Sequence, residues 1–205
     1  MIRKKLISLG KDGHLLLRGP DGREKPFRMR SGQEQGTAYL LIDSSESMAG
    51  EKLEQARRGA GNFIRQAITK GYGAGLISFD DHASVLVPRT SNYQDFEGPL
   101  ARLDAAGTTN MTEAFDLAFS VLSNITGARY VVVVSDGAPA DPQCAAASAR
   151  KLASIGVQLI TIATQDADAA FLAGIATARE LAIVVRQNQL QIGIANTALA
   201  LPLIT

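Results

Sequence analysis

The chain has 205 residues, of which 46% are hydrophobic and 20% charged, values that lie in the globular range and outside that of disordered chains. This length predicts one main domain and excludes a second domain of full size. The single cysteine, Cys144, excludes an internal disulfide and any multi-cysteine metal site. The first residues are too interrupted by charges for a signal peptide, and no stretch approaches the roughly 20 apolar residues of a membrane span. We therefore expect a cytoplasmic protein.

The charge is unevenly distributed along the chain. Residues 1–30 hold nine Lys or Arg against three Asp or Glu, a net charge of +6, whereas the remaining residues hold twelve against seventeen, or −5. Such a segment can bind nucleic acid or an anionic surface, or it can fold back on the acidic remainder of the chain. The last alternative is favoured, because no aromatic residues are interleaved with the basic ones.

Turn-forming residues divide the first part of the chain into short pieces. Gly-Pro-Asp-Gly at 19–22 and an Asp-Gly at 12–13 separate short apolar runs, which predicts a small meander of two or three strands. A polar linker at 31–36 follows. We therefore expect a basic, β-rich extension at 1–36 and the main domain at 37–205.

From residue 37 onward, short apolar runs alternate with longer segments of helical periodicity. Strands are predicted at 38–42, 74–79, 84–87, 130–134, 157–163 and 181–185. Helices are predicted at 51–69, 110–123, 142–155, 166–176 and 187–201. The turn at 80–83 is too short for a crossover, so the strands on either side of it should pair antiparallel. The pattern predicts an α/β fold: a doubly wound, mostly parallel six-stranded sheet with helices on both faces and one antiparallel edge strand.

Polar side chains follow two of the central strands and precede one helix. The strand at 38–42 runs into Asp43-Ser44-Ser45-Glu46-Ser47, the strand at 130–134 runs into Ser135-Asp136-Gly137, and Gly107-Thr108-Thr109-Asn110 leads into the helix at 110. In an open, doubly wound sheet, ligands bind beyond the carboxyl ends of the strands, where the strand order reverses. Oxygen ligands without a convergent histidine or thiol select Mg²⁺, Mn²⁺ or Ca²⁺ over zinc or copper. A small divalent cation is therefore expected there, with Mg²⁺ the best fit.

These three motifs, in this order and spacing, resemble the metal-ion-dependent adhesion site (MIDAS) of von Willebrand factor A (vWA) domains. The resemblance covers about residues 37–205 and implies the Rossmann-like vWA fold. It implies that Ser45 and Ser47 bind the ion directly, that Asp43 and Asp136 act partly through water, and that Thr109 is the threonine ligand. It also implies an adaptor or scaffold module whose partner protein supplies a Glu or Asp as the last ligand, of the small, intracellular bacterial type found in tellurium resistance.

Two positions depart from the usual vWA pattern without removing a ligand. Glu46 stands where a glycine is common; its carboxylate could repel an acidic ligand, replace one, or point to solvent, and solvent is favoured. Thr108 stands where a second glycine is common, which could change the flexibility of the loop.

Two other classes of function stay open from the sequence. A Mg²⁺-dependent phosphohydrolase also places an aspartate after the first strand, but the acid that such enzymes carry two residues later is Ser45 here. No His or Lys in or beside the three motifs is placed to move a proton, so we expect a protein that is not an enzyme. A nucleic-acid-associated protein would instead use the basic residues of 1–30.

Several further residues receive a structural interpretation. The Asp80-Asp81-His82 segment is expected to be a solvated hairpin turn, and Asp104 a polar loop residue. Cys144 is expected to be a small buried thiol. The apolar tail at 192–204 could pack on the domain or on another chain, so the oligomeric state stays open.

Overall fold

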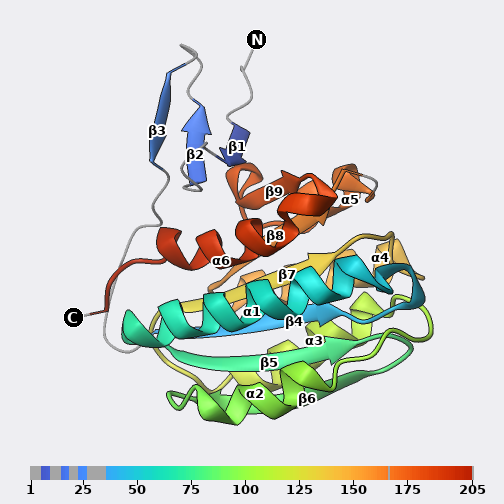
Figure 1. Cartoon of the computed structure of the whole chain (residues 1–205), viewed down its shortest axis with the longest axis horizontal. Helices are drawn as coiled ribbons and strands as arrows, with labels where there is room; N and C mark the ends of the chain where they lie inside the picture. Colours follow the sequence, from blue (N-terminus) through green and yellow to red (C-terminus); the bar gives the residue numbers. More distant parts are fainter. Residues whose placement is uncertain (1–5, 10–14, 19–22, 27–35, 166, 205) are drawn as a thin grey trace.

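The computed structural model describes residues 6–9, 15–18, 23–26, 36–165 and 167–204. Its main feature is a six-stranded sheet with the strand order β6-β5-β4-β7-β8-β9 (Figure 1). The strands are β4 (Thr37–Asp43), β5 (Gly73–Phe79), β6 (Ala83–Thr90), β7 (Arg129–Ser135), β8 (Val157–Thr164) and β9 (Ala182–Val185). The helices are α1 (Glu51–Thr69), α2 (Gln94–Ala101), α3 (Met111–Leu122), α4 (Pro142–Ser154), α5 (Ala169–Ile175) and α6 (Leu190–Ala200). Short 3₁₀ helices are η1 (Glu46–Met48), η2 (Arg179–Leu181) and η3 (Gln187–Gln189).

All neighbouring strands of this sheet are parallel except β5 and β6, which pair antiparallel at one edge. The predicted fold class is therefore confirmed. Helices cover both faces (Figure 1), so β4 is buried along its whole length and its sequence is a continuous apolar run instead of an alternating one.

The two faces of the sheet bury separate hydrophobic cores. Leu40 and Ile42 point to the side of α1, α2 and α6, where they join Phe63. Tyr39 and Leu41, at the alternate positions, point to the side of α3, α4 and α5. Burying one such aliphatic side chain contributes about 1.5–3 kcal/mol, so the face that each side chain of β4 takes is strongly specified.

The order of the strands reverses between β4 and β7. From β4 the chain crosses through α1 to β5 on one side, and it later returns to β7 on the other side of β4. The carboxyl ends of β4 and β7 thus lie next to each other, with Ile42 beside Val134. This is the place where a doubly wound sheet opens a crevice for ligands.

The first part of the chain forms a separate antiparallel meander of β1 (Leu6–Leu9), β2 (Leu15–Arg18) and β3 (Glu24–Pro26). β1 contacts β9 and η2, and β2 contacts α6, so the meander lies against one end of the main sheet (Figure 1). The predicted linker, apart from Gly36, and most of the basic residues of 1–30 lie outside the described residues.

Three elements differ from their predicted form. β6 continues through Pro88, which the sequence predicts to end it, because β6 is an edge strand and a missing N–H there disrupts no inner ladder. α2 is not predicted, since Gly98 and Pro99 interrupt its helical pattern. α5 begins only after Asp168, whose carboxylate caps it by accepting from Phe171 N at 2.9 Å.

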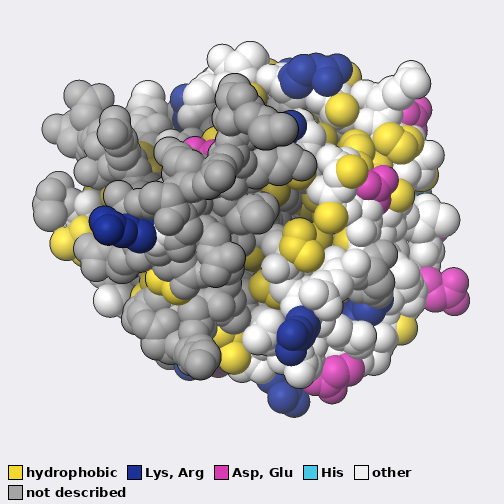
Figure 2. Space-filling view, turned by 90° about the horizontal axis from the view of Figure 1, so that it is seen from above, with side chains coloured by type: hydrophobic (Ala, Val, Ile, Leu, Met, Phe, Trp, Pro, Cys, Tyr) yellow, Lys and Arg dark blue, Asp and Glu magenta, His cyan; other side chains and the backbone are white. Residues whose placement is uncertain are grey.

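The expectation of a buried thiol at Cys144 is wrong, because this residue is exposed in the first turn of α4. α6 packs against α1, so most of the apolar tail covers the domain itself, while Ile192 and Leu203 remain 45% and 62% exposed. Seen from above, the described part of the surface shows scattered hydrophobic side chains alongside basic and acidic ones (Figure 2). Among the described residues, no helix has both the length and the apolar character that crossing a bilayer requires.

Candidate metal centre

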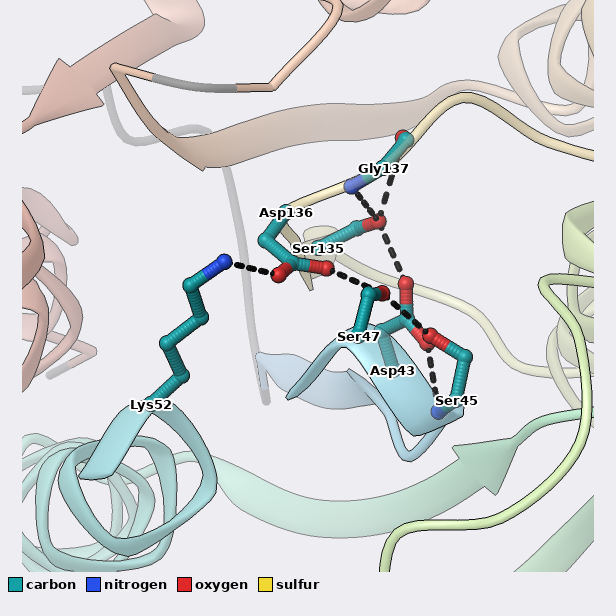
Figure 3. A network of polar contacts seen from close by, with 7 residues as sticks. All are labelled: Asp43, Ser45, Ser47, Lys52, Ser135, Asp136 and Gly137. Carbon is teal, nitrogen blue, oxygen red and sulfur yellow. Dashed lines mark hydrogen bonds and ion pairs between the residues drawn. The ribbon is translucent and has the colours of Figure 1, made fainter. Parts of the chain in front are cut away.

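The site begins at the last residue of β4. Asp43 is completely buried, and its Oδ1 accepts a hydrogen bond from Ser45 N at 2.8 Å while its Oδ2 accepts one from Ser135 Oγ at 2.5 Å (Figure 3). Burial raises the pKa of the Asp43 carboxyl above its usual value, and the nearby Asp136 charge adds to this, although the hydrogen bonds oppose it. A cation at this position would therefore relieve an unfavourable negative charge.

A chain of hydroxyl groups connects the two strand ends. Ser45 Oγ lies 3.0 Å from Ser47 Oγ, and Ser47 Oγ donates to Asp136 Oδ1 at 2.8 Å (Figure 3). Ser45 and Asp136 are 2% and 5% exposed, whereas Ser47 is exposed. The oxygen atoms thus form a cup that is buried at its base and reaches solvent at Ser47.

Thr109 joins the same cup from the third loop. It is 8% exposed, and a Cβ atom placed on Gly137 would lie 3.7 Å from Thr109 Oγ1 and 3.9 Å from Ser47 Oγ. The two hydroxyls therefore border the same small space above Gly137. The structure thus brings together all five predicted site residues: Asp43, Ser45, Ser47, Thr109 and Asp136.

Backbone hydrogen bonds fasten the three loops to one another. The loop after β4 is joined to the loop before α3 by Glu46 N to Gly107 O at 3.1 Å and by Ala106 N to Ser44 O at 2.8 Å. The loop after β7 is joined to Thr109 O by Ala140 N at 3.0 Å. The cup is therefore held by main-chain contacts that do not depend on its side chains.

The two departures from the vWA pattern leave the cup intact. Glu46 is exposed, as expected for a side chain that points to solvent. Thr108 is bound at both its N and its Oγ1 by Asp81 Oδ1, at 2.9 and 2.7 Å. Gly107, with φ +65°, allows this approach, because a Cβ atom there would lie 2.5 Å from Asp81 Oδ2. Thr108 thus fixes the loop to the β5–β6 turn.

Lys52 is the residue that the sequence analysis missed. The sequence motifs do not point to it, but its Nζ forms an ion pair with Asp136 Oδ2 (Figure 3). The Lys52 side chain is 15% exposed and that of Asp136 is 1% exposed. Lys52 lies in the first turn of α1, shortly after the Asp43–Ser47 motif, and this short distance along the chain was the available signal.

The donor set fits a hard divalent cation. It consists of two carboxylates and three hydroxyls, without a thiol or an imidazole. Within the described residues, no three His, Cys, Asp or Glu side chains lie close enough together to hold a metal, so an ion here would depend on the hydroxyl oxygens.

Comparison with known proteins agrees with this fold. Residues 38–138, which include the five site residues, match the family model of the von Willebrand factor type A domain. A UPF0353 protein of Mycolicibacterium paratuberculosis is 31% identical over 153 residues, covering 65% of this chain and 46% of the relative. The chain thus spans about half the length of the curated relatives it matches.

Two solved structures share the fold at low sequence identity. The vWF domain of the type V pili tip protein Mfa5 from Porphyromonas gingivalis has a TM-score of 0.73 at 14% identity, covering 80% of this chain and 94% of that one. Proximal thread matrix protein 1 from the mussel byssus, with a zinc-occupied MIDAS motif, has a TM-score of 0.64 at 15% identity, covering 82% and 46%. The family model matched at residues 38–138 and the shared fold identify a von Willebrand factor type A domain in this chain.

Proposed function

We propose that this vWA domain is a metal-dependent protein-binding module. A divalent cation held by Asp43, Ser45, Ser47, Thr109 and Asp136 would take an acidic side chain of a partner protein as its last ligand. The observation that carries the proposal is the continuous contact from Ser45 Oγ through Ser47 Oγ to Asp136 Oδ1, at 3.0 and 2.8 Å, at the point where the strand order reverses.

The exposure of the site supports a ligand from outside. Asp43 and Ser45 are buried and leave no room for a partner at the base, whereas Ser47 reaches the surface. Mg²⁺ usually keeps several waters when a protein supplies only a few oxygens, and an incoming carboxylate can replace one of them. We favour Mg²⁺ over Mn²⁺ and Ca²⁺; the zinc in the mussel protein supports the view that such a cup can also take other divalent ions.

We further propose that the site binds and does not catalyse. The Asp43 carboxylate accepts two hydrogen bonds, and Ser45, two residues later, is a poor proton donor. Lys52 is held in an ion pair with Asp136. Turnover of an aryl phosphate that is lost in Asp43→Asn would contradict this part of the proposal.

The test is calorimetric titration of Mg²⁺, Mn²⁺ and Ca²⁺ into the metal-stripped chain. We expect saturable binding of one ion, lost in the Ser45→Ala, Ser47→Ala double variant. The matched control is Ser91→Ala, an exposed serine between β6 and α2, which should bind like the parent. Equal binding by the double variant and the parent would overturn the proposed site.

A further inference from the structure

A groove on the outer face of α1 takes no part in the metal centre. It lies between α2 and the start of α6, the two helices that flank α1 on this side of the sheet (Figure 1), and it has a volume of about 430 Å³ that is open to solvent. Three arginines line it, Arg57, Arg58 and Arg65, together with one acidic residue, Glu97. Three positive charges against one negative charge leave these lining residues with a net charge of +2.

Arg65 is held in the groove by an aromatic ring. Its guanidinium carbon lies 4.1 Å from the centre of the Tyr93 ring, and it forms no ion pair with any residue that the structure describes. Gly61 lets Tyr93 lie against α1, because a Cβ atom on this glycine would lie 3.0 Å from the Tyr93 hydroxyl oxygen. A guanidinium stacked on a ring keeps the N–H donors in its own plane free, so Arg65 offers a fixed fork of donors to a ligand.

Arg58 also has donors to spare. Its side chain is 64% exposed, and its Nη2 lies 3.9 Å from Glu54 Oε2, which is beyond hydrogen-bond distance. The other oxygen of Glu54 is paired with Arg57, so one carboxylate is shared by two arginines. Asp104, 3.7 Å from Arg57, has a side chain that is 97% exposed, so water screens its charge. Counting Glu54 as well as Glu97 against the three arginines still leaves a net charge of +1.

The free donors of the groove lie on one face of α1. Arg58, Asn62 and Arg65 stand at positions i, i+4 and i+7, which places the two arginines about 10 Å apart along the helix axis with the amide between them. Gln191 of α6 adds a second amide side chain. Amide side chains both donate and accept hydrogen bonds, so they can bind the peptide groups of an extended chain. The groove thus combines donors for an anion with partners for a polypeptide backbone.

We propose that this groove binds a phosphorylated serine or threonine in an exposed segment of a partner protein, with Arg58 and Arg65 holding the phosphate oxygens. Guanidinium forks match phosphate oxygens in pairs, and a phosphate monoester carries about two negative charges at neutral pH. Arg65 already covers one face of the Tyr93 ring, so that face is closed to a nucleotide base. The groove is also open along the surface, whereas sites for small molecules enclose most of their ligand. The inference goes beyond the proposed function and does not depend on the metal centre.

The experiment titrates the whole chain, in EDTA, with an alanine pentapeptide that carries one central phosphoserine, and it follows the arginine Nε–Hε signals by NMR. We expect saturable shifts of Arg58 and Arg65. Arg58→Gln and Arg65→Gln should each weaken binding about tenfold, because a hydrogen bond between charged groups is lost. Arg65→Lys should weaken it nearly as much, since lysine keeps the charge without the fork. Glu97→Gln should tighten binding about twofold, because it removes an exposed like charge beside the phosphate.

The matched control is Arg150→Gln, which removes an exposed arginine of α4 on the other side of the sheet and should leave the affinity unchanged. The same peptide with serine or glutamate in place of phosphoserine, inorganic phosphate and adenosine monophosphate should all bind more weakly than the phosphopeptide. Equal affinity of Arg65→Gln and Arg150→Gln, in variants whose thermal unfolding stays cooperative, would overturn the inference. Equal or tighter binding of the glutamate peptide, inorganic phosphate or the nucleotide would also overturn it. Because EDTA is present throughout, none of these results bears on the proposed metal site.

Discussion

Aspartates stand at or just after the carboxyl ends of two neighbouring parallel strands, β4 and β5. The carboxylates of Asp43 and Asp81 nevertheless lie in opposite surroundings. Asp43 after β4 is completely buried among hydroxyls, and burial raises the pKa of its carboxyl. Asp81 after β5 is exposed, and hydrogen bonds from Thr108 lower the pKa of its carboxyl. A carboxylate at a strand end therefore becomes a candidate metal ligand only where other loops enclose it and bring further oxygen atoms.

Removing the charge of Asp43, and separately that of Asp81, tests this difference most directly. Asp43→Asn should weaken Mg²⁺ binding by about ten- to a hundredfold, because the buried carboxylate at the base of the cup loses its charge. The metal-free variant should unfold at the same or a higher temperature than the parent, since burying an ionised carboxylate is unfavourable. Calorimetry and thermal unfolding in EDTA measure the two effects.

The control for that experiment is Asp81→Asn in the neighbouring loop. It removes a carboxylate at the same edge of the sheet but outside the cup, so Mg²⁺ affinity should stay close to that of the parent. An equal loss of Mg²⁺ binding in Asp81→Asn would show that the two carboxylates are not separated as described here.

A second prediction concerns the contact between the two loops. Gly107→Ala should lower the free energy of unfolding by about 1–2 kcal/mol for its positive φ and by a further amount, because the new Cβ would displace Asp81. Gly156→Ala is the matched control, with φ +80° and its nearest neighbour, Arg129 Nη2, at a tolerable 3.4 Å. Urea denaturation should show the larger loss for Gly107→Ala, and an equal loss in both would contradict the role of Asp81.

The smallest effect is expected for the pH dependence of Asp81. Its pKa is lowered in the folded chain, so this carboxyl stabilises the fold above its ordinary pKa, and the contribution is lost as the pH falls through the lowered value. Thr108→Val removes the hydroxyl donor and should move the pKa of Asp81 upward. Carbon-detected NMR titration of the side-chain carboxyl measures this, and an unchanged pKa would refute the assigned hydrogen bond.

Much of the fold follows from the sequence because both faces of the sheet are covered. Continuous apolar runs such as 130–134 are recognisable, and the short turn at 80–83 allows only a hairpin. The extent of β6 and the existence of α2 were not predictable in the same way, because both depend on neighbouring elements of the fold. Pro88 is accepted within β6 because β6 is an edge strand and its pairing with β5 shifts register at this place. α2 forms despite Pro99 because Phe96 and Leu100 are buried in the core.

In the candidate site, too, some residues could be predicted from the sequence and one could not. Four of the five predicted site residues lie at the ends of β4 and β7, neighbouring strands whose order the alternation of elements defines, and Thr109 lies in the loop before α3. Lys52 could not be placed by helical periodicity, because it lies in the first turn of α1 and its ammonium contacts Asp136 in the loop after β7. The direction of a long side chain at a helix start is decided by its partner, and Asp136 is 84 residues away in sequence.

The main-chain links between the loops have a consequence for how such a domain can change. Since Glu46 N and Ala140 N hold the loops through carbonyl groups, the geometry of the cup does not depend on which side chains stand on its rim. Under the proposed function, an exposed position such as Glu46 could then be exchanged to suit a different acidic partner while the buried oxygens keep their places. Under the proposed function, partner choice and cation binding would in this way be carried by separate sets of atoms in the same three loops.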